Sequence, residues 1–261
     1  MSVSSIYEVI DYIDATAKTT EERGSMWERV TAFFLRSDPE QDQVMGKVSL
    51  WADAPTNTGH DVGIDLVAED ELVADDGSGR YWAIQCKAYV PTETLTYDDC
   101  STFWAKGVPD PAYARYMLST TTEHLSKNLL DQCKFTGTVI ITPSVMAESN
   151  VDWSAALVDS RSARRETYDL REHQRDAVRL IGASLETHDR CKAIMACGTG
   201  KTLMSLRLAE GRCPTGLVLF CAPSIALVGQ AMREWTNQAR TDLRTLVVCS
   251  DAKASRSRDS D

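Results

Sequence analysis

One carboxylate and one amine in the first half of the chain have a spacing suited to metal-assisted chemistry. Asp65 lies in the apolar run GIDLV, and Gln85-Cys86-Lys87 follows within a second run rich in strand-forming residues. Because side chains alternate along a strand, Gln85 and Lys87 are predicted to share one face and to converge with Asp65 on one metal ion. The Cys86 side chain then faces the core, and its backbone carbonyl can still reach the metal. A carboxylate inside an apolar strand needs a partner, which favours Asp65 over Asp61.

A glycine-rich turn in the second half lies between a predicted strand and a predicted helix, which is the setting of a nucleotide phosphate loop. Glycines let backbone N–H groups curl around a phosphate, and the helix N-terminus adds a partial positive charge. Lys201 is placed to contact the β- and γ-phosphates of ATP, and Thr202 to offer its hydroxyl to Mg²⁺. Met195 stands where the general motif has a glycine. The predicted nucleotide-binding residues of the loop are Gly198, Thr199, Gly200, Lys201 and Thr202.

The elements that must position these residues follow from apolar periodicity. In the first half, helical spacing predicts helices over 4–17, 25–35 and 123–133, and alternating apolar residues predict strands over 63–70, 80–90, 114–120 and 137–143. A turn at 75–77 is predicted to join the first two strands into a hairpin. In the second half, helices are predicted over 170–185, 201–211 and 224–239, and strands over 191–197, 216–223 and 244–250. The pattern is α/β with a central sheet.

The charge of the chain divides unevenly. Residues 1–160 hold 26 acidic and 11 basic side chains, and residues 161–261 hold 12 and 17, so the net charge of −10 is the sum of −15 and +5. Such asymmetry favours two units with different tasks. The predicted division is a first domain over 1–155, a linker over 156–169 and a second domain over 170–261.

Composition narrows the class of protein. Apolar residues make up 43% and charged residues 25% of the 261 residues, which excludes a disordered or fibrous chain. No apolar run reaches the roughly 20 residues needed to cross a bilayer, and the N-terminus has no secretory signal. Eight cysteines are scattered without metal-ligand spacing, which is typical of reduced thiols in a cytoplasmic protein.

Two further segments resemble motifs of superfamily-two helicases. The segment ending in His173-Gln174 resembles the Q-motif, which implies that Gln174 reads the adenine of ATP. Ala222-Pro223-Ser224, followed by Gln230, resembles motif Ia, which implies that Ser224 and Gln230 contact the DNA backbone. Taken alone, a serine that caps a helix explains Ser224 equally well. No acidic DExH-type motif follows Gln230, so we expect an incomplete ATPase that binds nucleotide poorly or not at all.

The first half resembles the Mrr-like branch of the PD-(D/E)XK nucleases, in which glutamine replaces the second acidic residue. The segment Gly24–Glu28 is similar to the N-terminal glutamate motif of that branch. The resemblance implies that Asp65 is the principal Mg²⁺ ligand, assisted by Gln85, and that Glu28 binds through the water shell of the metal. It further implies that Lys87 orients the attacking water and stabilises the charge that develops on the phosphate.

A nuclease placed ahead of a helicase-type motor resembles the N-terminal part of single-chain, ATP-dependent restriction–modification enzymes of the Type ISP group. The resemblance implies cleavage of double-stranded DNA after translocation, and further domains of the same polypeptide: a second RecA-like domain, a methyltransferase and a target-recognition domain. Two alternatives stay open: a stand-alone helicase–nuclease in phage defence or DNA repair, and a catalytically silent DNA-binding module fused to the ATPase. A P-loop metabolite kinase leaves Gln174 and Ser224 unexplained.

Overall fold

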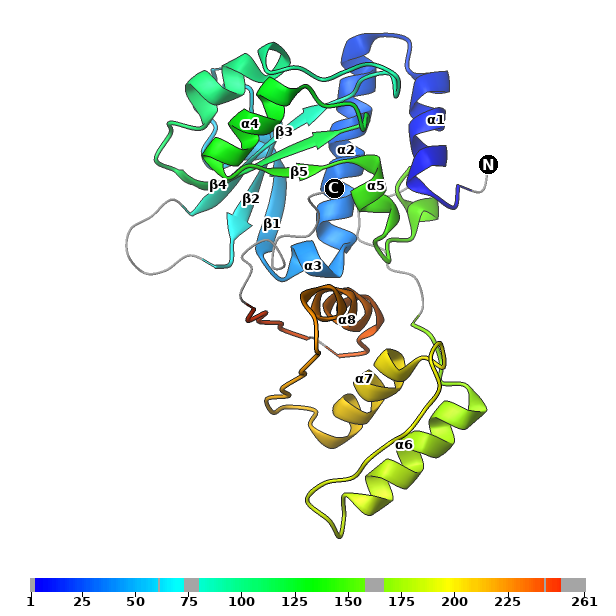
Figure 1. Ribbon diagram of the computed structural model, residues 1–261. Helices are drawn as coiled ribbons and strands as arrows, with labels where there is room; N and C mark the ends of the chain where they lie inside the picture. The colour runs from blue at the N-terminus through cyan, green and yellow to red at the C-terminus, as the bar shows by residue number, and fades with distance from the viewer. Residues whose placement is uncertain (1–2, 61, 73–79, 158–166, 242, 250–261) are drawn as a thin grey trace. The chain divides into compact units, whose positions relative to one another are not determined.

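A computed structural model describes residues 3–60, 62–72, 80–157, 167–241 and 243–249. The chain forms two compact units, Met1–Arg165 and Glu166–Asp261, and Figure 1 shows the elements of each. No helix in the described ranges is long and apolar enough to cross a membrane. The predicted domain limits and linker stay a prediction, because part of the segment 156–169 lies outside the described residues.

The first unit is built on a mixed sheet with strand order β1-β2-β3-β4-β5. Strands β1 to β3 pair antiparallel, and β3, β4 and β5 pair parallel. The predicted hairpin is confirmed, with Leu66 opposite Ile84, whereas the turn at 75–77 lies outside the described residues. The strands are β1 (Met45–Leu50), β2 (Leu66–Asp70), β3 (Tyr81–Lys87), β4 (Tyr113–Thr120) and β5 (Val139–Ile141).

Two apolar cores cover the two faces of this sheet. Helices α1 (Ile6–Thr16) and α2 (Thr20–Ser37) cover one face, and α4 (Lys127–Thr136) lies on the other with the segment around Phe103 (Figure 1). Strand residues alternate between the cores, as side chains on a pleated strand must. The predicted α/β architecture is therefore confirmed. The shorter elements are α3 (Pro39–Asp42), α5 (Pro143–Ala147), 3₁₀ turns at Trp51–Asp53, Asp98–Cys100 and Trp153–Ala155, and a π-helical turn at Phe103–Gly107.

Helix α2 begins earlier than predicted. The predicted start at Ser25 is wrong, because the Thr19 hydroxyl accepts a hydrogen bond from Glu22 N at 3.1 Å and caps the helix there. Such a cap stabilises a helix by about 1 kcal/mol, comparable to the cost of a glycine within it. Gly24 is therefore tolerated in the first turns, and Glu28 lies well inside a regular helix.

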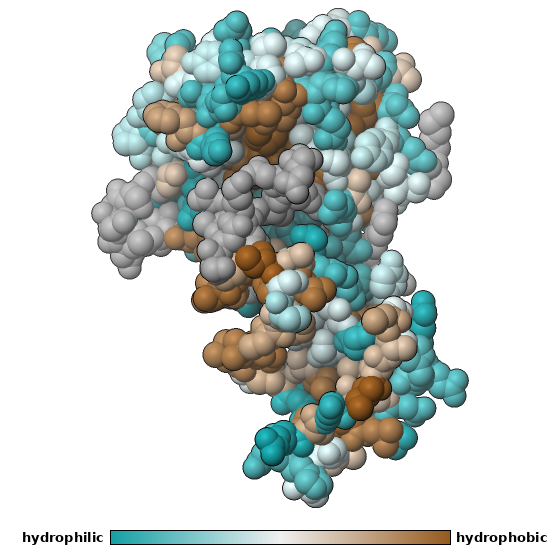
Figure 2. All heavy atoms as spheres, in the orientation of Figure 1, coloured by the Kyte–Doolittle hydropathy of each residue, from teal (hydrophilic) through white to brown (hydrophobic). Residues whose placement is uncertain are grey.

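The second unit contains three helices, α6 (Glu172–Ser184), α7 (Lys201–Arg212) and α8 (Ile225–Gln238), each close to its predicted range. The three predicted strands are wrong for the described residues, which form no strand there. Ile194, Leu217 and Leu246 are 84%, 96% and 89% exposed, and Figure 2 shows apolar residues at the surface of this unit. A buried strand depends on neighbouring strands for all its ladder hydrogen bonds, so apolar composition alone does not create one.

Candidate nuclease and nucleotide sites

Asp65 immediately precedes β2 and is tied to β3 by two hydrogen bonds. Its backbone N donates to Ile84 O at 2.9 Å, and its Oδ2 accepts from Cys86 N at 2.6 Å. The charge-assisted bond fixes one carboxylate oxygen over the strand that carries Gln85 and Lys87. The structure therefore brings Asp65 and the Gln85–Lys87 segment together, as the spacing predicted.

Gln85 differs from Asp65 and Lys87 in that its side-chain amide is buried and its oxygen is unsatisfied within the described part of the chain. Its side chain is buried at 3% exposure, and its Oε1 has no hydrogen-bond partner among the described residues. A buried amide oxygen left unsatisfied costs about 1–3 kcal/mol. Amide and carboxylate oxygens are the ligands that a hard cation such as Mg²⁺ takes. The residues present therefore fit an Mg²⁺ ion that completes the bonding of this oxygen.

Helix α2 covers one face of the sheet and carries Glu28 to a position where the charge of Asp65 acts on it. Burial, and next the charge of Asp65, raise the pKa of Glu28 to about 7. Two carboxylates that repel each other are the electrostatic setting in which a cation binds. Within the described ranges no three His, Cys, Asp or Glu side chains form a metal-binding group. A cation held here therefore needs the Gln85 amide as well as the carboxylates.

The Cys86 side chain packs against the core that contains α2, as predicted. Burial and the charge of Asp65 raise the pKa of its thiol, against a hydrogen bond with Thr31. The Thr31 hydroxyl lies 2.9 Å from the Ser119 hydroxyl, a buried pair that links α2 to β4. Sequence reasoning missed this pair. The only signal is that Ser119 opens the run of small polar residues Ser119–Thr122 at the end of a strand.

In the second unit, the predicted phosphate loop enters helix α7 through two left-handed glycines. Gly198 has φ 76° and Gly200 has φ 73°, a conformation that other residues adopt only with strain. Lys201 Nζ donates to Ala196 O at 2.8 Å, and Thr199 Oγ1 donates to the same oxygen at 2.8 Å. The loop therefore folds back on itself, and the Lys201 ammonium is hydrogen-bonded to the backbone carbonyl of Ala196.

Gln174 supports this loop from helix α6. It is 4% exposed, its Nε2 donates to Thr199 O at 2.9 Å, and its Oε1 accepts from Arg171 N at 2.7 Å. A Cβ on Gly200 would lie 2.3 Å from Gln174 Nε2, so a larger residue there would displace the Gln174 amide from the loop. The structure brings Gln174 and the loop together, and the adenine contact of Gln174 stays a prediction.

Thr202 has a partner that sequence reasoning missed. Burial raises the pKa of the Glu234 carboxyl, and the Thr202 hydroxyl and Leu203 N near it oppose that rise. The next residue, Trp235, donates from Nε1 to Thr202 O at 3.1 Å. No sequence pattern signals this contact, because it depends on how α8 packs against α7.

Ser224 immediately precedes helix α8, and Gln230 lies within it. Ser224 Oγ accepts from Leu227 N at 3.3 Å and therefore caps the helix, which is the alternative that the sequence left open. Gln230 is exposed. Their contact with DNA stays a prediction.

Comparison with known proteins assigns both units. Residues 36–163 match the family model of a restriction endonuclease, and residues 167–260 match that of the Type III restriction enzyme res subunit. No curated protein matches the chain. A solved structure, the ATP-dependent Type ISP restriction–modification enzyme LlaBIII bound to DNA, matches with TM-score 0.69 and 25% identity over 91% of this chain. This chain spans 15% of the length of that enzyme.

The chain joins a restriction endonuclease domain to a restriction-enzyme helicase region. Asp65, Gln85 and Lys87 lie inside the matched endonuclease range, whereas Glu28 precedes it. Gln174, the phosphate loop and α8 all lie inside the matched helicase range.

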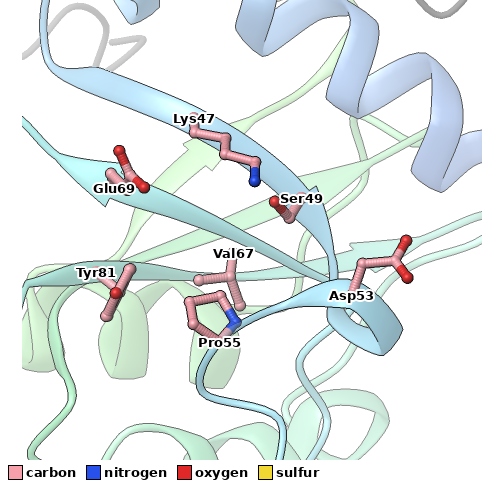
Figure 3. Close-up of a pocket in the computed structure, with 7 residues that line it drawn as sticks. All are labelled: Lys47, Ser49, Asp53, Pro55, Val67, Glu69 and Tyr81. Atoms are coloured by element: carbon pink, nitrogen blue, oxygen red, sulfur yellow. The ribbon is translucent and has the colours of Figure 1, made fainter.

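The endonuclease domain also has a 320 Å³ cavity on its antiparallel strands (Figure 3). None of Asp65, Gln85, Lys87 and Glu28 lines it. One ammonium, two carboxylates and a phenol share its wall, and this mixture does not select a ligand. The lining residues are Lys47, Ser49, Asp53, Pro55, Val67, Glu69 and Tyr81.

Proposed function

We propose that the endonuclease domain hydrolyses phosphodiester bonds of double-stranded DNA with the help of Mg²⁺. The observation that carries this proposal is the buried Gln85 Oε1, which has no hydrogen-bond partner among the described residues and lies on the strand whose Cys86 N binds the Asp65 carboxylate. A purely structural hairpin has no use for an unsatisfied amide oxygen, because replacing it by an apolar group would remove the cost.

In this proposal Asp65 and Gln85 hold the metal directly, with the Cys86 backbone carbonyl as a further ligand and Glu28 acting through the water shell. When bound, Mg²⁺ supplies charge neutralisation at the phosphate and lowers the pKa of water. Lys87 is partly exposed on the same face as Gln85, where its ammonium can orient the attacking water and stabilise the negative charge that develops on the phosphate.

Nicking of supercoiled plasmid in Mg²⁺ by this chain and by its Asp65→Ala variant tests the proposal. We expect the wild-type chain to nick DNA in Mg²⁺ and not in EDTA, and the variant to lose this activity. Asp53→Ala is the matched control, since it removes a carboxylate from the separate 320 Å³ cavity of the same domain. Equal nicking by wild type and Asp65→Ala would leave the alternative of a catalytically silent DNA-binding module.

We further propose that the helicase region belongs to an ATP-driven translocase on duplex DNA. Gly198, Thr199 and Gly200 supply backbone N–H groups for the phosphates, Lys201 and Thr202 contact the phosphates and Mg²⁺, and Gln174 selects adenine. Ser224 and Gln230 contact the DNA backbone.

Lys201→Ala in the complete enzyme is expected to abolish DNA-stimulated ATP hydrolysis while the endonuclease domain stays folded. Retained ATP hydrolysis in that variant would contradict the motor assignment, and circular dichroism with urea unfolding checks the fold.

For the whole protein we propose a cytoplasmic restriction–modification enzyme that cleaves foreign DNA, such as phage DNA, and carries further domains in the same polypeptide. The support is the likeness to LlaBIII, of whose length this chain spans 15%. Transfer of methyl groups to DNA by the complete protein tests this proposal. Cleavage without methyl transfer would favour the stand-alone helicase–nuclease.

A further inference from the structure

A buried pair of hydroxyls ties helix α2 to the sheet of the endonuclease domain. Thr31 Oγ1 on α2 lies 2.9 Å from Ser119 Oγ on β4, and both residues have 0% exposure. Because both residues are shielded from solvent, the two hydroxyls satisfy each other in place of water. A side-chain hydrogen bond tolerates only a narrow range of distances and angles, so the pair constrains where α2 lies on the sheet.

The pair meets the sheet at the position on β3 that binds Asp65. Ser119 lies opposite Cys86 in the parallel pairing of β4 with β3, and Cys86 N donates to Asp65 Oδ2 at 2.6 Å. Side chains opposite each other on neighbouring strands point to the same face, and the Cys86 side chain packs in the core that contains α2. A continuous chain of contacts therefore leads from Thr31 through Ser119 and Cys86 to Asp65.

The turn of α2 that carries Glu28 lies directly before this contact. Thr31 follows Glu28 by three residues, and residues three apart on a helix lie on the same face. The same stretch of α2 contributes Trp27 and Phe34 to the core beneath it. Such apolar contacts are non-directional and tolerate small rotations and shifts of the helix, whereas the hydroxyl pair does not. The place of Glu28 relative to Asp65 therefore depends on the hydroxyl pair.

A second polar contact of α2 with the sheet lies farther from Glu28. Arg36 Nη2 donates to Val48 O on β1 at 2.7 Å, and Arg36 follows Glu28 by eight residues. This contact holds the C-terminal end of α2. Loss of the Thr31 hydroxyl would therefore release mainly the turn that carries Glu28 and leave the rest of the helix in place.

We propose that Thr31 and Ser119 are positioning residues of the endonuclease site, whose hydroxyl pair holds the Glu28 carboxylate at the distance from Asp65 that the metal and its water shell need. Both hydroxyls are buried and bonded to each other, so they act through Glu28 and not on DNA. Groups that orient a metal ligand affect metal affinity even though they do not touch the metal. This inference rests on the proposed nuclease function.

The test is Mg²⁺ binding by Thr31→Val, which removes the hydroxyl and keeps the β-branched shape. Isothermal titration calorimetry with Mg²⁺ in the absence of DNA is expected to show Kd raised about tenfold. Plasmid nicking is expected to need about tenfold more Mg²⁺, with kcat at saturating Mg²⁺ changed by less than about twofold. Thr31→Ser keeps the hydroxyl and is expected to restore both values to within about twofold of wild type.

Thr138→Val is the matched control. It removes one hydroxyl of another close pair in the same domain, since Thr136 Oγ1 and Thr138 Oγ1 lie 2.6 Å apart after helix α4. This pair makes no link to α2, so the variant is expected to bind Mg²⁺ as wild type does. Weakened binding in this control equal to that in Thr31→Val would overturn the inference.

A double-mutant cycle separates positioning from a purely structural role. In the Glu28→Gln background, Thr31→Val is expected to weaken Mg²⁺ binding no further, since the carboxylate that it positions is gone. An equal loss in both backgrounds, or unchanged Mg²⁺ affinity in Thr31→Val, would overturn the inference. Should Thr31→Val unfold, Ser119→Ala removes the other hydroxyl of the pair, and it too must weaken Mg²⁺ binding only where Glu28 is present. A wild-type chain that neither binds Mg²⁺ nor nicks DNA would overturn the proposed nuclease function itself, and this inference with it.

Discussion

Replacing Glu28 by glutamine is expected to stabilise the endonuclease domain at alkaline pH. Burial and the charge of Asp65 raise the pKa of Glu28 from 4.5 to about 7. The unfolded chain therefore loses this proton near pH 4.5, while the folded domain keeps it until near pH 7. Between these values the folded state binds more protons than the unfolded chain. The contribution of Glu28 to the free energy of unfolding is therefore greatest below pH 4.5 and is lost as the pH rises through 7.

The size of the effect follows from the same two values. A pKa difference between 4.5 and about 7 corresponds to at most about 3 kcal/mol. Glu28 is only partly buried, and solvent screening reduces this to about 1–2 kcal/mol. Glu28→Gln removes the ionisation, so the variant gains that amount at pH 8 and little at pH 5.

Urea unfolding in EDTA, followed by tryptophan fluorescence at a series of pH values, measures this difference. Glu21→Gln, at an exposed position in the first turn of the same helix, is the control and is expected to show no such pH dependence. A stability difference independent of pH, or a loss of stability in Glu28→Gln at pH 8, would refute the reasoning. The same substitution weakens the proposed metal site, so greater stability is expected to accompany slower DNA cleavage.

Two further substitutions test the packing around each site. Gly63→Ala is expected to lower the free energy of unfolding of the endonuclease domain by about 1–3 kcal/mol in urea, because Gly63 has φ 71° and the added Cβ would meet the backbone of Phe103. Gly24→Ala in helix α2 is the control. The added Cβ meets no atom within 4 Å there, so this variant should be neutral or stabilising. In the complete enzyme, Glu234→Gln is expected to tighten Mg²⁺–ATP binding about fivefold in a fluorescence titration, because a negative charge near Thr202 no longer repels the phosphates. Unchanged or weaker binding would contradict this.

Local patterns predicted most of the first unit. Alternating apolar residues predicted the hairpin of β2 and β3, and helical spacing predicted α1 and most of α2 and of α4. The start of α2 was wrong because a threonine cap outweighed a glycine. The strands of the second unit were wrong because a parallel strand depends on neighbours that a local pattern does not contain.

In the candidate sites, too, local arrangements were predicted and contacts between distant segments were not. The proximity of Asp65 to the segment of Gln85 and Lys87 was predicted because one hairpin joins them, and the glycine-rich loop because it is contiguous, while the roles of these residues stay predictions. Contacts between distant segments were not found. The contact of Trp235 with Thr202 and that of Thr31 with Ser119 depend on packing between segments that no spacing rule connects.

Strand β3, which carries the proposed nuclease residues Gln85 and Lys87, pairs with the neighbouring strand β2 on one side and with the more distant β4 on the other. This arrangement sets the order in which the proposed site can assemble. Strands β2 and β3 are neighbours along the chain, and their hairpin closes at a small entropy cost. The parallel pairing of β3 with β4 must first close the loop between these two strands, and such non-local contacts form slowly. A chain that has formed only the hairpin already holds Asp65 and Gln85 side by side. It gains the parallel half of the sheet, in which Thr120 lies opposite Lys87, only when β4 docks.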